Sequence, residues 1–330
     1  ACGQGIDGGA TAGLPVSLTP SPTSMPTQAV LAPTETAVLA TTPTPIPTPQ
    51  PAPTTAPETA VSVNELERFE ALESQFLGNS RIVRIFLPPN YRHELNRRHY
   101  PVLYLNDGQV AGRWGLRQTL LDLYRAEQIE PLIVVTIFNN DFRNFEYGTA
   151  GIPNADGEGN RADLYTRFVI EELKPAIDAQ YRTLPEPEHT AVLGASLGGL
   201  SAFDMAWRQP ETFGIVGAMS GSFWWYDAGQ NEMERVANRI VHRYVSEAEQ
   251  RPNIRVWLSA GTAERRAYRD GVGEITAVRD TGDLADLLMQ QGYRKPDELS
   301  YTIIPNGIHN GETWRTVLPD FLLWAFPRSG

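Results

Sequence analysis

The chain has 330 residues, of which 41% are hydrophobic, and its formal net charge is −11. This length allows one sizeable hydrophobic core, while the acidic balance and the lack of a basic stripe exclude a function that depends on phosphate binding, so we expect no nucleic-acid partner. No run of eighteen apolar residues occurs, and the sequence therefore predicts no membrane-spanning helix.

The first sixty residues differ in composition from the rest of the chain. They contain twelve of the 26 prolines and neither Lys nor Arg, because the first basic residue is Arg68. Such a segment buries too little apolar surface to offset its ordering entropy. We predict a disordered Pro/Thr-rich tether over residues 1–62, followed by one domain over residues 63–330.

Cys2 is the only cysteine, which excludes an intrachain disulfide and a metal site with several cysteine ligands. The opening Ala-Cys-Gly resembles the start of a bacterial lipoprotein, in which Cys2 would be the lipid attachment site. This resemblance implies an extracytoplasmic protein, at the cell surface or in the periplasm, that contacts a membrane only through the lipid. A stray thiol is the alternative, and Ala1 departs from the pattern.

The elements of the domain follow in chain order. Period-two alternation over residues 68–77 and 81–89 predicts two antiparallel strands, and unbroken apolar runs at 101–107 and 131–138 predict strands buried on both faces. Because helical spacing over 113–128 separates the two runs, a parallel sheet is favoured. Further helices are predicted at 161–181, 198–208, 232–250 (exposed), 281–292 and 313–326, and further strands at 190–195, 214–220, 254–261 and 300–306. The sequence thus predicts an α/β three-layer sandwich whose ligands bind at the carboxyl ends of the strands.

The segment Gly194-Ala195-Ser196-Leu197-Gly198 follows a predicted buried strand and opens a helix of small residues. A strained turn between a strand and a helix needs glycines around it, and it exposes the serine hydroxyl at the helix N-terminus. We interpret Ser196 as a nucleophile, with the Leu197 N–H stabilising a developing oxyanion. A structural turn is the alternative.

A serine nucleophile needs a base that takes its proton. In the chain order of this fold, the base is a histidine and is the last of the three catalytic residues, the triad. His309 lies on a glycine-containing loop between the last strand and the last helix, whereas His242 lies on an amphipathic helix where a solvated face is expected. The acid should follow the penultimate strand, and Glu264 is the first carboxylate there. Asp270 is the alternative acid, and an ion pair with a neighbouring arginine is the alternative role for Glu264.

Six stretches carry a resemblance to a known family: "FLPPNY", "YPVLYLNDGQ", "ELKPAIDAQYRT", "GASLGGLSAF", "MSGSFWW" and "GIHNGETWR". In this order they resemble the esterase D and enterochelin-esterase-like branch of the α/β-hydrolases over most of residues 66–326. The resemblance implies the α/β-hydrolase fold and a serine hydrolase without cofactor or metal, in which Ser196, His309 and Glu264 act together. The acidic member varies within the family.

The same resemblance implies that the loop around Gly108 and Gln109 donates the second oxyanion N–H. "DFRNFEYG" is similar to the Arg-x-x-Glu stretch of the branch, with Arg143 and Glu146 in its places. We interpret these two residues as an internal ion pair at the rim of the pocket, with substrate contact by Arg143 as the other possibility. Trp314 resembles the family pattern in its spacing from His309, and we expect it to fix the histidine loop by packing.

Phe223, Trp224 and Trp225 follow a buried strand next to the expected position of the serine. Large rings there predict a substrate-binding wall, and core packing is the competing explanation for about half of them. We therefore predict a serine carboxylic-ester hydrolase acting on a small-molecule or polysaccharide-linked ester. An acyltransferase similar to the mycolyltransferases and a non-catalytic tethered binding module are the alternatives. The sequence predicts neither the ester nor the oligomeric state.

Overall fold

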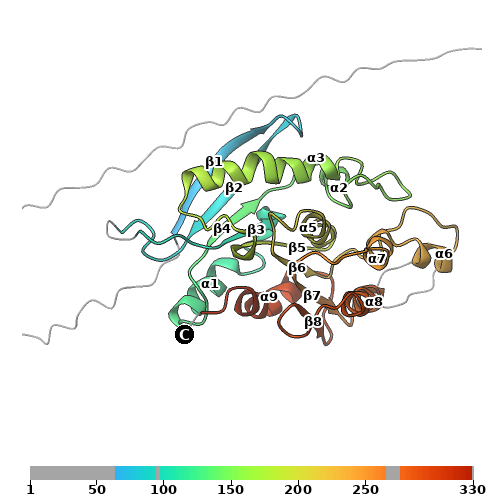
Figure 1. Cartoon of the computed structure of the whole chain (residues 1–330). Helices are drawn as coiled ribbons and strands as arrows, with labels where there is room; N and C mark the ends of the chain where they lie inside the picture. Colours follow the sequence, from blue (N-terminus) through green and yellow to red (C-terminus); the bar gives the residue numbers. More distant parts are fainter. Residues whose placement is uncertain (1–63, 94–96, 265–275, 329–330) are drawn as a thin grey trace, which may run out of the picture. The chain divides into compact units, whose positions relative to one another are not determined.

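The computed structural model describes residues 64–93, 97–264 and 276–328, and Figure 1 shows their arrangement. These described residues belong to one compact unit. The predicted tether and its boundary at residue 62 lie outside the described residues. Nowhere in the described ranges is there a helix with the length and apolar character needed to cross a membrane.

A single eight-stranded sheet organises the described part of the chain, in the order β1-β2-β4-β3-β5-β6-β7-β8. The first two strands pair antiparallel with each other, as the alternating pattern predicted, and β2 also pairs antiparallel with β4. All pairs from β4 to β8 are parallel. The four central strands, β4, β3, β5 and β6, are buried at every position, which explains their largely apolar sequences. The bounds are β1 Asn64–Ser74, β2 Asn79–Leu87, β3 Val102–Asn106, β4 Ile133–Ile137, β5 Thr190–Ala195, β6 Ile215–Met219, β7 Arg255–Gly261 and β8 Leu299–Ile304.

Helices cover both faces of the sheet, and two hydrophobic clusters form the layers between. One cluster joins the sheet to α5, α7 and α8, and the other joins it to α1 and α9, which also contact each other (Figure 1). The architecture is therefore the predicted α/β-hydrolase three-layer sandwich. The α-helices are α1 Leu116–Arg125, α2 Arg143–Glu146, α3 Ala162–Arg167, α4 Lys174–Gln180, α5 Leu197–Arg208, α6 Glu232–Ala237, α7 Ile240–Ser246, α8 Thr276–Gln290 and α9 Gly311–Ala325, and short 3₁₀ turns occupy η1 Gly108–Val110 and η3 Pro187–His189.

Two predicted helices differ from the structure. The helix predicted over 161–181 is continuous but contains a π-helical turn, η2 Phe168–Leu173, between α3 and α4. The exposed helix predicted over 232–250 is instead two short helices, α6 and α7. Of these two helices, α6 has no buried residues. The other, α7, packs one side against the core, because the apolar residues of α7 recur at helical spacing.

Candidate active site

Ser196 lies at the turn from β5 to α5, where it is the N-cap residue of the helix. Its backbone has φ 55° and ψ −128°, a conformation that costs a non-glycine residue about 1–3 kcal/mol and persists only where the surroundings fix it. Two hydrogen bonds help to fix it, because the Ser196 N–H donates to the Met219 carbonyl at 2.9 Å and the Ser222 N–H donates to the Ser196 carbonyl at 3.0 Å. The side chain is half-buried. Such strain at an accessible serine is typical of a nucleophile.

Gly194 makes this turn possible. A Cβ atom at position 194 would lie 2.1 Å from the Gly198 carbonyl oxygen, so the first turn of α5 sits directly against the end of β5. Any side chain there would push the helix away from the strand. The glycine of the motif is therefore required by close packing of backbone on backbone.

Glu264 and His309 contact each other in the structure. Nδ1 of His309 lies 2.8 Å from Oε2 of Glu264. The glutamate side chain is 3% exposed and that of the histidine is 46% exposed, so a buried carboxylate faces an imidazole that reaches solvent. A carboxylate can only accept hydrogen bonds, so this contact makes Nδ1 the protonated nitrogen and leaves Nε2 free to take a proton.

The loop that carries His309 is fixed against the end of β7. A Cβ atom at Gly261 would lie 2.3 Å from the Gly307 carbonyl oxygen, and that oxygen also accepts a hydrogen bond from the Ala263 N–H at 2.9 Å. On the other side of the histidine, Asn310 caps α9 by accepting from the Thr313 N–H at 2.9 Å. The backbone on both sides of His309 is therefore fixed by its neighbours.

Ser196, Glu264 and His309 follow β5, β7 and β8, which are parallel strands of one sheet. All three therefore lie at the same carboxyl edge. The described residues include no hydrogen bond between the Ser196 hydroxyl and the His309 imidazole. The acid and the base are thus in contact, and the nucleophile shares their edge of the sheet.

The loop after β3 reaches the same edge. Asp107 adopts a left-handed conformation, φ 58° and ψ 42°, which turns the chain from β3 into η1. Its carboxylate forms two 2.8 Å hydrogen bonds with Nε and one Nη of Arg143, and it also accepts from the Asn139 side chain. The Asp107 N–H donates to the Tyr147 hydroxyl at 3.1 Å. Burial raises the pKa of Tyr147 well above its ordinary value, so this phenol stays neutral.

Asn106 connects this loop to the nucleophile turn. Its side-chain amide donates to the Gly198 carbonyl at 3.0 Å and accepts from the Tyr165 hydroxyl at 2.7 Å. The predicted oxyanion residues Gly108 and Gln109 directly follow, Gly108 buried and Gln109 exposed, while Leu197 begins α5. The end of β3 and the start of α5 are therefore held together. Sequence reasoning did not single out Asn106 or Asp107, although two polar residues directly after a buried strand are the signal that could have found them.

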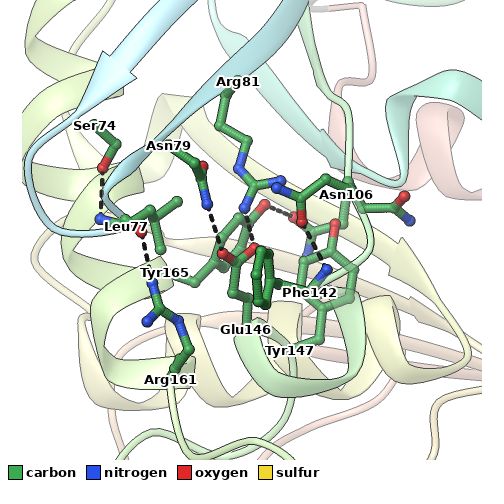
Figure 2. A network of polar contacts seen from close by, with 12 residues as sticks. Ser74, Leu77, Asn79, Arg81, Asn106, Phe142, Glu146, Tyr147, Arg161 and Tyr165 are labelled. Atoms are coloured by element: carbon green, nitrogen blue, oxygen red, sulfur yellow. Dashed lines mark hydrogen bonds and ion pairs between the residues drawn. The ribbon is translucent and has the colours of Figure 1, made fainter.

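The prediction that Arg143 and Glu146 form an ion pair with each other is wrong, because each has a different partner. Arg143 pairs with Asp107. Glu146 pairs with Arg81 of β2, as Figure 2 shows. Both members of the second pair are almost fully buried, and the Asn79 side chain also donates to Glu146 at 3.3 Å. The pair therefore joins α2 to the antiparallel edge of the sheet. Substrate contact by Arg143, whose side chain is 28% exposed, stays a prediction.

The predicted aromatic wall is divided between core and surface. Phe223 and Trp225 are 0% and 1% exposed and belong to the hydrophobic core, so for these two the core-packing explanation holds. Trp224 is partly exposed and lies against Trp225, with ring centroids 5.6 Å apart. Substrate binding therefore remains a prediction for Trp224 alone.

His242 differs from its expected place on a solvated face. It is buried in α7, and its Nε2 lies 2.8 Å from the Asp280 carbonyl oxygen. Burial, assisted by the nearby Arg239 charge, lowers the pKa of His242 to about 3. A histidine of this kind is neutral and structural at neutral pH.

Two predicted residues lie outside the described ranges: Cys2, the predicted lipid attachment site, and Asp270, the alternative acid. Across the described residues there is no group of three or more His, Cys, Asp or Glu side chains that could hold a metal ion.

Comparison with known proteins decides the family. The model of the family described as "Putative esterase" matches residues 74–325. The chain belongs to this esterase family. The enzyme is a carboxylic-ester hydrolase.

The esterase is similar to curated relatives with named activities. It is 30% identical over 161 residues to the endo-1,4-beta-xylanase/feruloyl esterase of Xylanibacter ruminicola, covering 45% of this chain and 20% of the relative. It is also 30% identical over 199 residues to the iron(III) enterobactin esterase of Escherichia coli K12, covering 60% of this chain and 45% of the relative. The esterase thus spans less than half the length of these two relatives.

A solved ferulic acid esterase has the same fold. Its structure aligns with a TM-score of 0.62 at 20% identity, over 81% of this chain and 98% of that one. The esterase therefore shares its fold with this enzyme along nearly the whole of the latter.

Proposed function

We propose that the esterase hydrolyses carboxylic esters through an acyl-enzyme on Ser196, with His309 as general base and Glu264 as the acid that orients it. The observation that carries this proposal is the 2.8 Å contact between His309 Nδ1 and the buried Glu264 carboxylate at the sheet edge where Ser196 lies. The strained turn at Ser196 supports it.

In the proposed reaction, Nε2 of His309 takes the Ser196 proton while Oγ attacks the ester carbonyl. The N–H groups of Leu197 and of the Gly108–Gln109 loop stabilise the oxyanion. The tetrahedral intermediate then collapses, and the alcohol leaves with the proton from His309. Water attacks the acyl-enzyme with the same base, which releases the acid and restores the Ser196 hydroxyl.

The mechanism is tested with Ser196→Ala and the matched control Ser201→Ala, which removes a buried serine hydroxyl from the same helix. We expect turnover of p-nitrophenyl acetate to fall by about 10³-fold or more in the first variant and to be unchanged in the second. A fluorophosphonate probe should label wild type and the control but not Ser196→Ala. Equal turnover by wild type and Ser196→Ala would overturn the mechanism.

We further infer that the substrate carries an aromatic group that contacts Trp224. Two relatives are named for feruloyl and enterobactin esters, and Trp224 is a partly exposed ring in the segment after β6. Trp224→Ala should lower kcat/KM for methyl ferulate at least about 10-fold more than for methyl acetate. Equal losses for both esters would contradict an aromatic contact, and the acetate serves as the internal control.

A further inference from the structure

Ser220 is a buried serine beside the candidate triad that the proposed mechanism does not use. It directly follows β6, between the strands that carry Ser196 and Glu264, and it is 2% exposed. Its hydroxyl donates to Oε1 of Glu264 at 2.6 Å and accepts from Nε1 of Trp314 at 2.8 Å. The serine therefore joins the acid to the helix that follows His309.

The direction of these two hydrogen bonds is determined by chemistry. An indole N–H can only donate, so Trp314 occupies a lone pair of the Ser220 oxygen. The single hydroxyl proton is then directed at Glu264, where the Gly261 N–H donates to the same Oε1 at 2.8 Å. Oε1 is thus satisfied by two donors, and Oε2 remains for His309.

The backbone holds Ser220 in this place. Its φ is 49°, and its N–H donates to the Ser259 carbonyl at 2.8 Å, which extends the pairing of β6 with β7 by one residue. Two residues later, the Ser222 N–H donates to the Ser196 carbonyl. One short segment therefore contacts the acid through a side chain and the nucleophile through the backbone.

We propose that Ser220 is a positioning residue that orients the Glu264 carboxylate toward His309, and that Trp314 sets the direction of the Ser220 hydroxyl. This inference rests on the proposed function of the triad. It assigns Trp314 a polar contact in addition to its edge-to-face packing on the His309 ring, whose centroid is 5.2 Å away.

The proposal makes a signed prediction for the pH profile. Without the Ser220 hydroxyl, the buried Glu264 carboxylate loses a donor, so it protonates at higher pH. While ionised, it also stabilises the His309 imidazolium more strongly. The active pair consists of a neutral imidazole and an ionised carboxylate. As the pH decreases, both effects cause the variant to lose this pair at a higher pH than wild type does. The acidic limb of the kcat/KM profile should therefore move to higher pH.

The test compares Ser220→Ala with Ser259→Ala. Ser259 is the matched control because it is a fully buried serine on the neighbouring strand whose hydroxyl has no hydrogen-bond partner among the described residues. We expect Ser220→Ala to lower kcat about 10- to 100-fold, to leave KM nearly unchanged and to shift the acidic limb of the pH profile to higher pH. Ser259→Ala should leave kcat, KM and the acidic limb unchanged. Ser220→Gly removes the same hydroxyl and suits the positive φ, so it replaces the alanine variant if that one does not fold.

The role of Trp314 is tested with Trp314→Phe, which keeps an aromatic ring and removes the N–H. In wild type this change should lower kcat, but in the Ser220→Ala background it should add little, because the hydroxyl that it directs is gone. If Trp314→Phe lowers kcat by the same factor in wild type and in the Ser220→Ala background, Trp314 acts on His309 through packing alone. That result would overturn the role assigned to Trp314.

The outcomes separate this inference from the proposed function. If Ser196→Ala abolishes turnover while Ser220→Ala and Ser220→Gly keep the wild-type kcat and pH profile, the positioning role of Ser220 is wrong and the triad stands. If Ser196→Ala keeps wild-type turnover, both proposals fail together. A lower kcat with an unmoved acidic limb would also overturn the positioning role, because general damage to packing would explain it.

Discussion

Arg143 holds the carboxylate of Asp107 through two parallel hydrogen bonds of 2.8 Å, at the point where the chain leaves β3 for the loop of Gly108 and Gln109. The guanidinium also lies over the Tyr147 ring, 5.2 Å from its centroid. Since the Asp107 N–H donates to the Tyr147 hydroxyl, one arginine contacts both partners of that hydrogen bond. The conformation of this loop therefore depends on Arg143.

Arg143→Gln should lower kcat about 10-fold with little change in KM, because Asp107 loses its charged partner and the loop loses its fixed conformation. Arg143→Lys should recover only part of this loss, since an ammonium cannot form the two parallel bonds. Steady-state kinetics on p-nitrophenyl acetate measure both values. Arg167→Gln, which breaks an exposed pair with Glu171, is the control. A rise in KM at constant kcat would instead indicate the direct substrate contact predicted for Arg143.

Glu264→Gln should reduce kcat by about 10³- to 10⁴-fold while the fold is retained. Oε1 of Glu264 accepts from Ser220 and Gly261, and Oε2 faces His309, so every position around the carboxylate requires an acceptor. A glutamine must turn its NH₂ group toward one of these sides. Exposed Glu312→Gln on α9 is the control, and a Glu264→Gln variant with wild-type kcat would exclude Glu264 as the acid.

Glu146→Ala should destabilise the protein by about 3–5 kcal/mol, because it leaves the buried Arg81 guanidinium without its partner. Glu171→Ala breaks the exposed pair with Arg167, about half exposed on each side, and should cost less than about 1 kcal/mol. Urea unfolding followed by circular dichroism measures both. Equal midpoints for the two variants would mean that the buried pair contributes no more than a surface pair.

His242 should make the protein sensitive to mild acid. Its native pKa is lowered to about 3, whereas an unfolded histidine titrates near 6.5, so below about pH 6.5 the unfolded state binds more protons than the native state. Stability from the neutral imidazole is complete above that pH and falls by up to about 1.4 kcal/mol per pH unit as the pH decreases toward 3. His242→Gln removes this dependence. The difference in Tm between wild type and variant should therefore narrow from pH 7 to pH 4.5, and a constant difference would contradict a neutral buried His242.

The sequence predicted well those features that depend on local pattern. Runs such as residues 131–138 are apolar because both faces of the central strands are covered, and Gly194 is required by the contact of β5 with α5. Chain order singled out His309 and Glu264, since each predicted triad member follows a particular strand. The structure brings these two side chains into contact, and their roles as base and acid stay a prediction.

Pairings between distant segments could not be read in the same way. Arg143 and Glu146 are three residues apart and suggested a local pair, but their partners lie 36 and 65 residues away. The burial of Phe223 and Trp225 could not be predicted for a similar reason. Adjacent aromatic residues look alike in sequence, and the packing of distant segments decides which of them reaches the surface. Ser220 was overlooked because nothing in "MSGSFWW" indicates a carboxylate 44 residues further along the chain.

The distribution of the site over strand ends has a consequence for measuring folding. The hydroxyl, the carboxylate and the imidazole belong to residues that follow three different strands, so their relative positions are fixed only when the sheet is folded. Ester turnover should therefore disappear together with the global unfolding transition in denaturant. A colorimetric assay would then report the fraction of intact molecules as directly as any spectroscopic probe.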